Sequence, residues 1–187
     1  MLPASMRGVH RPLATILALL ALAAPAAGLG ACGSSDEHEV VEGEPAELGE
    51  LTYNIQLTRF LNPDDIEDAE YLQGQPAAPP GESYFGVFVR IDNESDDEDL
   101  RSTSEYSIVD IRGSRYEPVA SESPFALEVG GIVPAADQLP VSDSPAAAGA
   151  AAGGVLIFLV EDSVVNARPL QLEIEGEDES ASVQLDM

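Results

Sequence analysis

Short segments in which apolar and polar residues alternate recur along this chain of 187 residues, and they constrain its fold more than any other feature. The strongest is SYFGVFVRIDN, in which every second residue from Phe85 to Ile91 is apolar. A period of two residues is that of a β-strand with a buried face. LTYNIQLTRF (51–60) alternates in the same way, and VLIFLV (155–160) is continuously apolar, as in a fully buried strand. The pattern therefore predicts an all-β protein.

Turn signals separate these strands and complete the predicted fold. YSIVDIRGSRYEPV predicts a hairpin with Gly113 in its turn. Asn62 and Pro63 predict the start of one short helix, whereas the alanine-glycine run SPAAAGAAAGG (144–154) holds too much glycine for a dependable one. Seven to eight short strands with turns between them predict an immunoglobulin-like antiparallel β-sandwich. The remaining predicted strands are FALEV (125–129), LQLEIE (170–175) and SVQLDM (182–187).

The first 31 residues have the features of an export signal. A basic start is followed by the uncharged run LATILALLALAA (13–24), which is too short for a helix that spans a bilayer. Leu29, Gly30, Ala31 and Cys32 then resemble the lipobox of bacterial lipoproteins. We expect Cys32, the only cysteine of the chain, to carry the lipid, since a thiolate is a strong nucleophile. The alternative is ordinary secretion, with cleavage near the APA at 24–26.

The domain boundaries follow from these two signals. Residues 1–31 are expected to be removed as the signal peptide. Residues 32–50 are acidic, small and poor in large apolar side chains, so they predict a lipidated, disordered tether. Residues 51–187 are then expected to form the sandwich as a single domain.

Charge excludes several classes of function. From Cys32 onward the chain holds 34 acidic residues, six arginines and no lysine, which leaves 28 net negative charges. Such a surface repels nucleic acid, so no nucleic-acid partner is expected. The same part of the chain has a single histidine, His38, in the predicted tether, so no histidine-based nucleophile or zinc site is expected. We therefore expect no enzymatic activity.

Carboxylates are the remaining candidates for chemistry. They cluster in DDIEDAE (64–70), ESDDED (94–99) and EGEDE (175–179), which offer oxygen ligands for Ca²⁺ but do not have EF-hand spacing. No other cofactor is expected. A hydrolase with two carboxylates is a further alternative. The candidate calcium ligands are Asp64, Asp65, Glu67 and Asp68.

Three segments resemble an immunoglobulin-like family of unknown function that is found on exported bacterial lipoproteins. They are YFGVFVRIDNESDD, YSIVDIRGSRYEPV and GGVLIFLVED. The resemblance implies a sandwich fold and anchoring to a membrane, and it brings no catalytic residues with it.

These observations predict an exported protein that a lipid on Cys32 attaches to the extracytoplasmic side of the cell membrane. Its sandwich is expected to bind an envelope protein or a cell-wall component. The alternatives are a Ca²⁺-dependent structural or adhesive domain and, further off, the carboxylate hydrolase.

Overall fold

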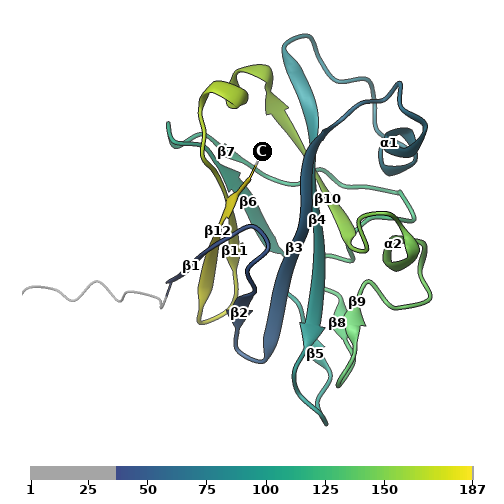
Figure 1. Cartoon of the computed structure of the whole chain (residues 1–187), viewed down its shortest axis with the longest axis vertical. Coiled ribbons are helices and arrows are strands. Elements are labelled where there is room, and N and C mark those ends of the chain that lie inside the picture. Colours follow the sequence, from purple (N-terminus) through teal and green to yellow (C-terminus); the bar gives the residue numbers. More distant parts are fainter. Residues whose placement is uncertain (1–36, 187) are drawn as a thin grey trace, which may run out of the picture. The chain divides into compact units, whose positions relative to one another are not determined.

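The protein was analysed as a computed structural model, which describes residues 37–186. Two β-sheets pack face to face in this part of the chain, and a third, two-stranded sheet lies at one end (Figure 1). Sheet A contains, in spatial order, β1 (Glu37–Val41), β12 (Ser180–Leu185), β11 (Leu170–Glu175), β6 (Glu105–Val109) and β7 (Arg115–Tyr116).

Sheet B contains the longest strands. Its spatial order is β10 (Gly154–Glu161), β4 (Glu82–Asn93), β3 (Leu51–Leu61) and β2 (Ala46–Leu48), and β9 (Gln138–Leu139) also pairs with β4. The small third sheet joins β5 (Leu100–Arg101) to β8 (Ile132–Val133). The predicted all-β sandwich is thus confirmed, although the described residues form twelve strands rather than seven or eight.

The alternation in β4 explains its central place. Phe85, Val87, Val89 and Ile91 are all fully buried in the core between the two sheets. The opposite face of β4 carries Phe88, which is 1% exposed and belongs to a second apolar cluster on the outer side of sheet B. The sequence predicted one fully buried and one mixed face, and this is confirmed: Phe88 is buried on the second face, whereas Arg90 stays partly exposed there.

Segments between the strands form the cover over the outer face of sheet B (Figure 1). They include α1 (Ile66–Tyr71), α2 (Pro145–Ala148) and the chain around Phe125. Tyr71 of α1 stacks edge to face on Phe88 of β4 with 5.0 Å between ring centroids. The sheet is thus buried from two sides. A 3₁₀ helix, η1 (Asp162–Asn166), follows β10 at the end of the fold opposite the third sheet (Figure 1).

The predicted tether is wrong for residues 37–48. β1 pairs in parallel with β12, and β2 pairs antiparallel with β3, so residues from Glu37 onward already belong to the sandwich, which was predicted to start at Leu51. One acidic side chain holds this segment in place: the carboxylate of Glu42 accepts hydrogen bonds from the Thr58 hydroxyl (2.7 Å) and the Asp186 N–H (2.8 Å). The acidic composition hid two strands because edge strands need few apolar residues.

Three local predictions also need correction. The strand expected at 125–129 is absent as a ladder, and the chain there only bridges β10 through Ala126 and Val155. The short helix starts at Ile66 with Asp65 as its N-cap, three residues later than Asn62 and Pro63 indicated. The alanine run forms one helical turn because the Ser144 hydroxyl caps it.

Two glycines are required by geometry. Gly113 has φ +82° in the turn of the β6–β7 hairpin, which confirms the predicted hairpin. Gly154 lies so close to Leu127 that a Cβ on it would be 2.8 Å from the Leu127 Cα. This approach seats the segment before β8 against the start of β10.

Candidate functional site

The four residues of the predicted lipid signal, Leu29, Gly30, Ala31 and Cys32, lie outside the described residues, so lipidation stays a prediction. Within residues 37–186 no helix is long and apolar enough to cross a membrane. His38, which was assigned to the tether, is exposed on β1.

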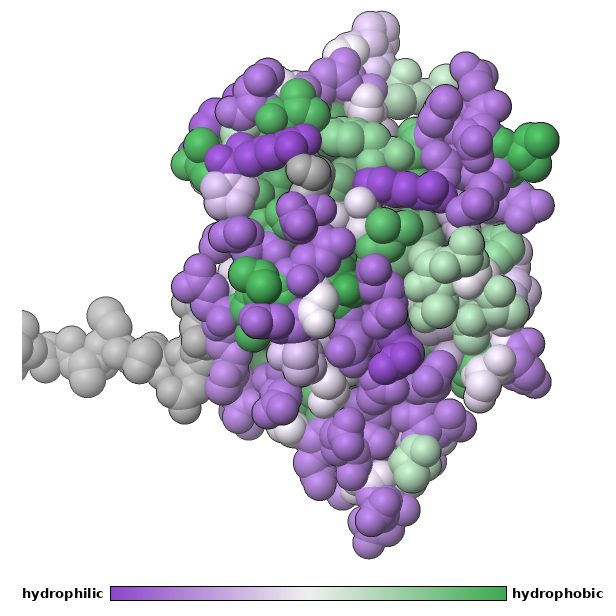
Figure 2. Space-filling view, viewed as in Figure 1, coloured by the Kyte–Doolittle hydropathy of each residue, from purple (hydrophilic) through white to green (hydrophobic). Residues whose placement is uncertain are grey.

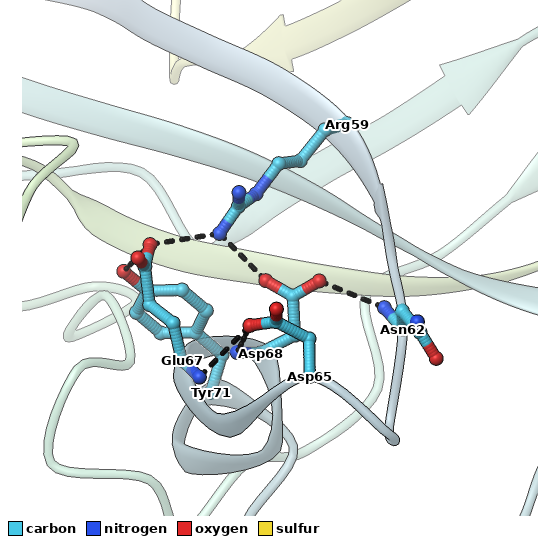
Figure 3. A network of polar contacts seen from close by, with 6 residues as sticks. All are labelled: Arg59, Asn62, Asp65, Glu67, Asp68 and Tyr71. Carbon is cyan, nitrogen blue, oxygen red and sulfur yellow. Dashed lines mark hydrogen bonds and ion pairs between the residues drawn. The ribbon is translucent and has the colours of Figure 1, made fainter.

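The predicted calcium ligands lie at the start of α1, where three of them bind other parts of the protein (Figure 3). The Asp65 carboxylate caps the helix by accepting hydrogen bonds from the N–H groups of Glu67 (2.9 Å) and Asp68 (3.3 Å). The Asp68 carboxylate accepts one from the Asn62 N–H at 2.8 Å. Asp64 is exposed and takes no part in these contacts.

An arginine from β3 completes this network and neutralises part of its charge. Arg59 Nη2 lies 2.6 Å from Asp68 and 2.9 Å from Glu67, and its guanidinium stands 5.8 Å from the ring centre of Tyr71. Burial, together with a hydrogen bond to Glu67, raises the pKa of Tyr71 to about 12. The cluster therefore fastens α1 to sheet B.

In this arrangement three of the four predicted calcium ligands, Asp65, Glu67 and Asp68, already bind groups of the protein. Asp65 Oδ1, Glu67 Oε1 and both oxygens of Asp68 already accept hydrogen bonds from the protein, whereas a Ca²⁺ ion takes about six to eight oxygen ligands. In the part of the chain that the structure describes, no three histidine, cysteine, aspartate or glutamate side chains are grouped so as to hold a metal. Sequence could not reveal the decisive partner, since Arg59 belongs to another element.

A hollow of about 510 Å³ lies at the end of the sandwich where β2 turns into β3 and β11 turns into β12. We call it the open-end cleft. Loops from both sheets form its walls, and a smaller hollow of about 300 Å³ adjoins it along the β11–β12 turn. This end of the molecule is mostly hydrophilic in Figure 2. The open-end cleft is lined by Leu48, Gly49, Leu51, Tyr53, Arg101, Ser102, Thr103, Ser104, Glu105, Glu175, Gly176, Glu177, Asp178 and Glu179.

Hydrogen bonds between loops hold the walls of the cleft. The Gly49 N–H donates to the Glu179 carboxylate at 2.8 Å and so joins the β2–β3 turn to the β11–β12 turn. The Thr103 hydroxyl donates to the Glu175 carbonyl, and the Thr103 N–H donates to the Tyr53 hydroxyl at 3.1 Å. Tyr53 is 2% exposed, and its burial raises the pKa of its hydroxyl, an effect that the Thr103 N–H partly offsets. The cleft is therefore preformed.

The charge of the open-end cleft is negative. Five carboxylates line it, whereas Arg101 is the single cation among its lining residues and donates to the Gly130 carbonyl at 2.6 Å. Arg115, beside the cleft, pairs with Glu173 and Glu175. Across residues 37–186 no hydrogen bond or ion pair reaches the carboxylates of Glu105, Glu177 or Asp178. These carboxylates therefore give the cleft a negative potential that attracts cationic groups.

The sequence indicated this region only in part. The acidic run at 175–179 was among the predicted carboxylate clusters, and it supplies one wall of the cleft. The opposite walls, from Tyr53 and from residues 101–105, could not be assigned from sequence because they meet the run only through the packing of the two sheets.

No protein-family model matches the chain, and no curated protein matches it. Among solved structures, the yjhA protein from Bacillus subtilis is similar over 80% of this chain and 99% of that one, with 14% identity and a TM-score of 0.50. This likeness shows the fold alone.

Two further solved structures are more distant. An uncharacterised β-sandwich protein from Clostridium difficile 630 matches with 14% identity, 80% of this chain, 95% of that chain and a TM-score of 0.44. The secreted protein MPT63 from Mycobacterium tuberculosis matches with 10% identity, 81% of this chain, 99% of that chain and a TM-score of 0.45. Neither carries an argument about function. The sandwich implied by the sequence resemblance is thus confirmed, whereas no comparison identifies the chain as a member of a lipoprotein family.

Proposed function

We propose that this chain is an exported, lipid-anchored binding module and that the open-end cleft is its binding surface. The observation that carries the proposal is the cleft itself: a hollow of about 510 Å³ with five carboxylates and one arginine among its lining side chains. Its ligand is a cationic group, such as a lysine- or arginine-bearing segment of an envelope component.

Export and anchoring are supported by the sequence that precedes the sandwich. The basic start, the short apolar run and the sequence LGAC at 29–32 are together typical of a lipoprotein signal. Diacylation of a cysteine, with a further acyl chain, holds a protein firmly on a bilayer at about 0.8 kcal/mol per buried methylene.

The binding role is supported by the way the cleft is built. Three loops that belong to different sheets converge on it, and hydrogen bonds between them fix their positions before any ligand arrives. A preformed site loses less conformational entropy on binding than a mobile one. Three of its carboxylates, from Glu105, Glu177 and Asp178, have no partner within residues 37–186 and are therefore available to a ligand.

The anchoring is tested by the variant Cys32→Ala in the native host. We expect the wild-type chain to sediment with membranes and its mature N-terminus to carry a lipid by mass spectrometry, while the variant is released. Membrane sedimentation that does not change in the variant would contradict the anchor.

The binding role is tested by calorimetry with a soluble pentalysine peptide and the processed chain carrying Cys32→Ser. We expect binding that weakens as salt rises, because salt screens exposed charges over about 10 Å at 0.1 M. The triple variant Glu105→Gln, Glu177→Gln and Asp178→Asn should weaken it at least tenfold.

A matched control removes three negative charges elsewhere. Asp64, Glu70 and Glu122 are exposed carboxylates around α1, and their amide variants should bind the peptide as the wild type does. Equal loss of binding in both triple variants would show that net charge alone attracts the peptide, which would remove the cleft as the site.

A further inference from the structure

The chain enters the sandwich at the same end as the open-end cleft. β1 and β12 run parallel, and Glu37 at the start of β1 is paired with Ser180 at the start of β12. Ser180 directly follows Glu179, which lines the cleft, and it also lines the smaller adjoining hollow. The parallel register thus fixes which end of the sandwich lies next to the preceding chain.

The length of the preceding chain limits the distance between an anchor on Cys32 and the open end of the sandwich. Five residue steps separate Cys32 from Glu37, and covalent geometry allows them at most about 18 Å. Neighbouring strands lie about 5 Å apart, so the Cys32 Cα is within about 23 Å of the Ser180 Cα. By contrast, the ten residue steps of β3 from Leu51 to Leu61 span about 33 Å. An anchor on Cys32 is therefore tied to the open end of the fold.

The opposite end of the sandwich holds the β6–β7 turn, because Val109 at the end of β6 pairs with Gln171 near the start of β11. There the β6–β7 turn packs on η1 through the hydrogen bond from the Ile111 N–H to the Ala167 carbonyl at 3.2 Å. Ile111 is 63% exposed in that turn. This end carries no chain that leads to Cys32 and serves as the reference position for an orientation experiment.

We infer that the lipid anchor turns the open end toward the bilayer, so that the cleft takes its ligand from the membrane surface. The partner that fits is an extramembrane, lysine- or arginine-bearing segment of a membrane-embedded protein. This inference rests on the proposed lipid anchor and binding role, and it adds the orientation of the domain and the location of its partner. The short link between Cys32 and Glu37 is what carries it, because a long tether would leave the domain free to turn.

The orientation is tested on vesicles of phosphatidylcholine that contain a maleimide lipid. The processed chain is coupled through its single thiol, Cys32, which places the anchor where the proposed lipid would be. A fluorescent non-canonical amino acid replaces either Ser104, which lines the cleft, or Ile111 at the opposite end. We expect headgroup-labelled quencher lipids to quench the label at position 104 at least threefold more strongly than the label at position 111.

A linker variant separates orientation from mere proximity. Insertion of a 20-residue Gly/Ser segment after Ser35 gives a flexible coil of about 25 Å root-mean-square span and should abolish the difference between the two labels. Equal quenching at both positions without the linker would overturn the inference, as would a difference that survives the linker.

The location of the partner is tested in the same vesicles with a transmembrane peptide that carries four lysines at its outer flank. A photocrosslinker in place of Ser104 should capture this peptide, and one in place of Ile111 should not. Equal capture from both positions, or equal capture of a peptide with a serine flank, would overturn the inference. The pentalysine titration of the soluble chain tests the binding role separately. The Cys32→Ala variant tests the anchor separately.

Discussion

The carboxylate of Asp68 lies 2.6 Å from the guanidinium of Arg59, and this contact joins α1 to β3. Asp68 is buried, with 5% exposure, whereas Arg59 also reaches the more exposed Glu67. A buried carboxylate that loses its cation keeps its desolvation cost. We therefore expect Arg59→Met to lower the free energy of unfolding by about 2 kcal/mol.

Thermal unfolding measures this loss as a fall in melting temperature of about 4–8 °C for a chain of this size. The matched control is Arg90→Met, because the Arg90 partner Asp92 is more exposed and such pairs contribute at most about 1 kcal/mol. Equal falls in the two variants would contradict a special role for the Asp68 contact.

The carboxylate of Asp110 is expected to make the unfolding free energy of the protein depend on pH. Burial alone would raise the pKa of its carboxyl, but hydrogen bonds from the Ser114 N–H and from Arg112 outweigh burial and hold the pKa below its ordinary value of 3.8. A lowered folded-state pKa contributes stability above the ordinary value and loses it as the pH falls through the lower one. Asp110→Asn should therefore destabilise the protein at pH 7.

The difference in unfolding free energy between this variant and the wild type should become smaller below about pH 4, where the wild-type carboxylate starts to be protonated. Chemical denaturation at pH 7, 5 and 3 measures the unfolding free energy of both proteins. Asp64→Asn, at an exposed carboxylate, serves as the control and should track the wild type. A gap that stays constant with pH would contradict the role of the Asp110 charge.

The close approach of Gly154 to Leu127 predicts that even a methyl group is too large there. Gly154→Ala should cost about 1–3 kcal/mol of unfolding free energy, because the new Cβ would lie 2.8 Å from the Leu127 Cα in a well-packed region. Gly149→Ala is the matched control, since its Cβ would meet its nearest atom at 3.4 Å. Urea unfolding distinguishes the two, and unchanged stability of Gly154→Ala would show that the segment at 127 can move.

The corrected start of the domain predicts unequal effects of two truncations of the mature chain. Removal of residues 33–36 should leave the melting temperature unchanged. Removal of residues 33–48 also deletes β1 and β2, takes away the strand paired with β12, and removes the fully buried Ala46 together with Val40 and Leu48, which pack on the core. We expect this longer truncation to cost at least about 3 kcal/mol, which thermal unfolding would detect. Equal stability of both truncated forms would show that residues 37–48 do not stabilise the sandwich and would support their original prediction as a tether.

Periodicity in the sequence predicted the strands that face a core. The alternation in β4 and β3 and the continuous apolar run in β10 were sufficient, because side-chain burial repeats every two residues along a strand. It did not predict β1 and β2, which add only Val40, Ala46 and Leu48 to the core and otherwise depend on backbone pairing with β12 and β3. Parallel pairing between residues more than 140 positions apart leaves no local signal.

Of the open-end cleft, the sequence predicted only the acidic composition of one wall. The run at 175–179 was visibly acidic, yet the same was true of residues 64–70, which the structure places in a network with Arg59. The difference between an acidic wall of a cleft and an acidic helix cap lies in what packs opposite. For the run at 175–179 it is Thr103, which lies 72 residues before Glu175 in the sequence. For the helix cap it is Arg59, which lies only nine residues before Asp68 but belongs to β3.

The double cover over β4 sets the order in which the backbone would release its amide protons to solvent. Its neighbour β3 pairs with it from Tyr84 to Asn93 and β10 from Glu82 to Val89, and the side chains of Val87, Phe88 and Val89 are buried. Deuterium can reach such amides only when the whole domain opens, whereas short strands at a sheet edge exchange through local fraying. The slowest amides of β4 therefore report the global stability of the molecule, and those of β1 report how firmly its first strand is held.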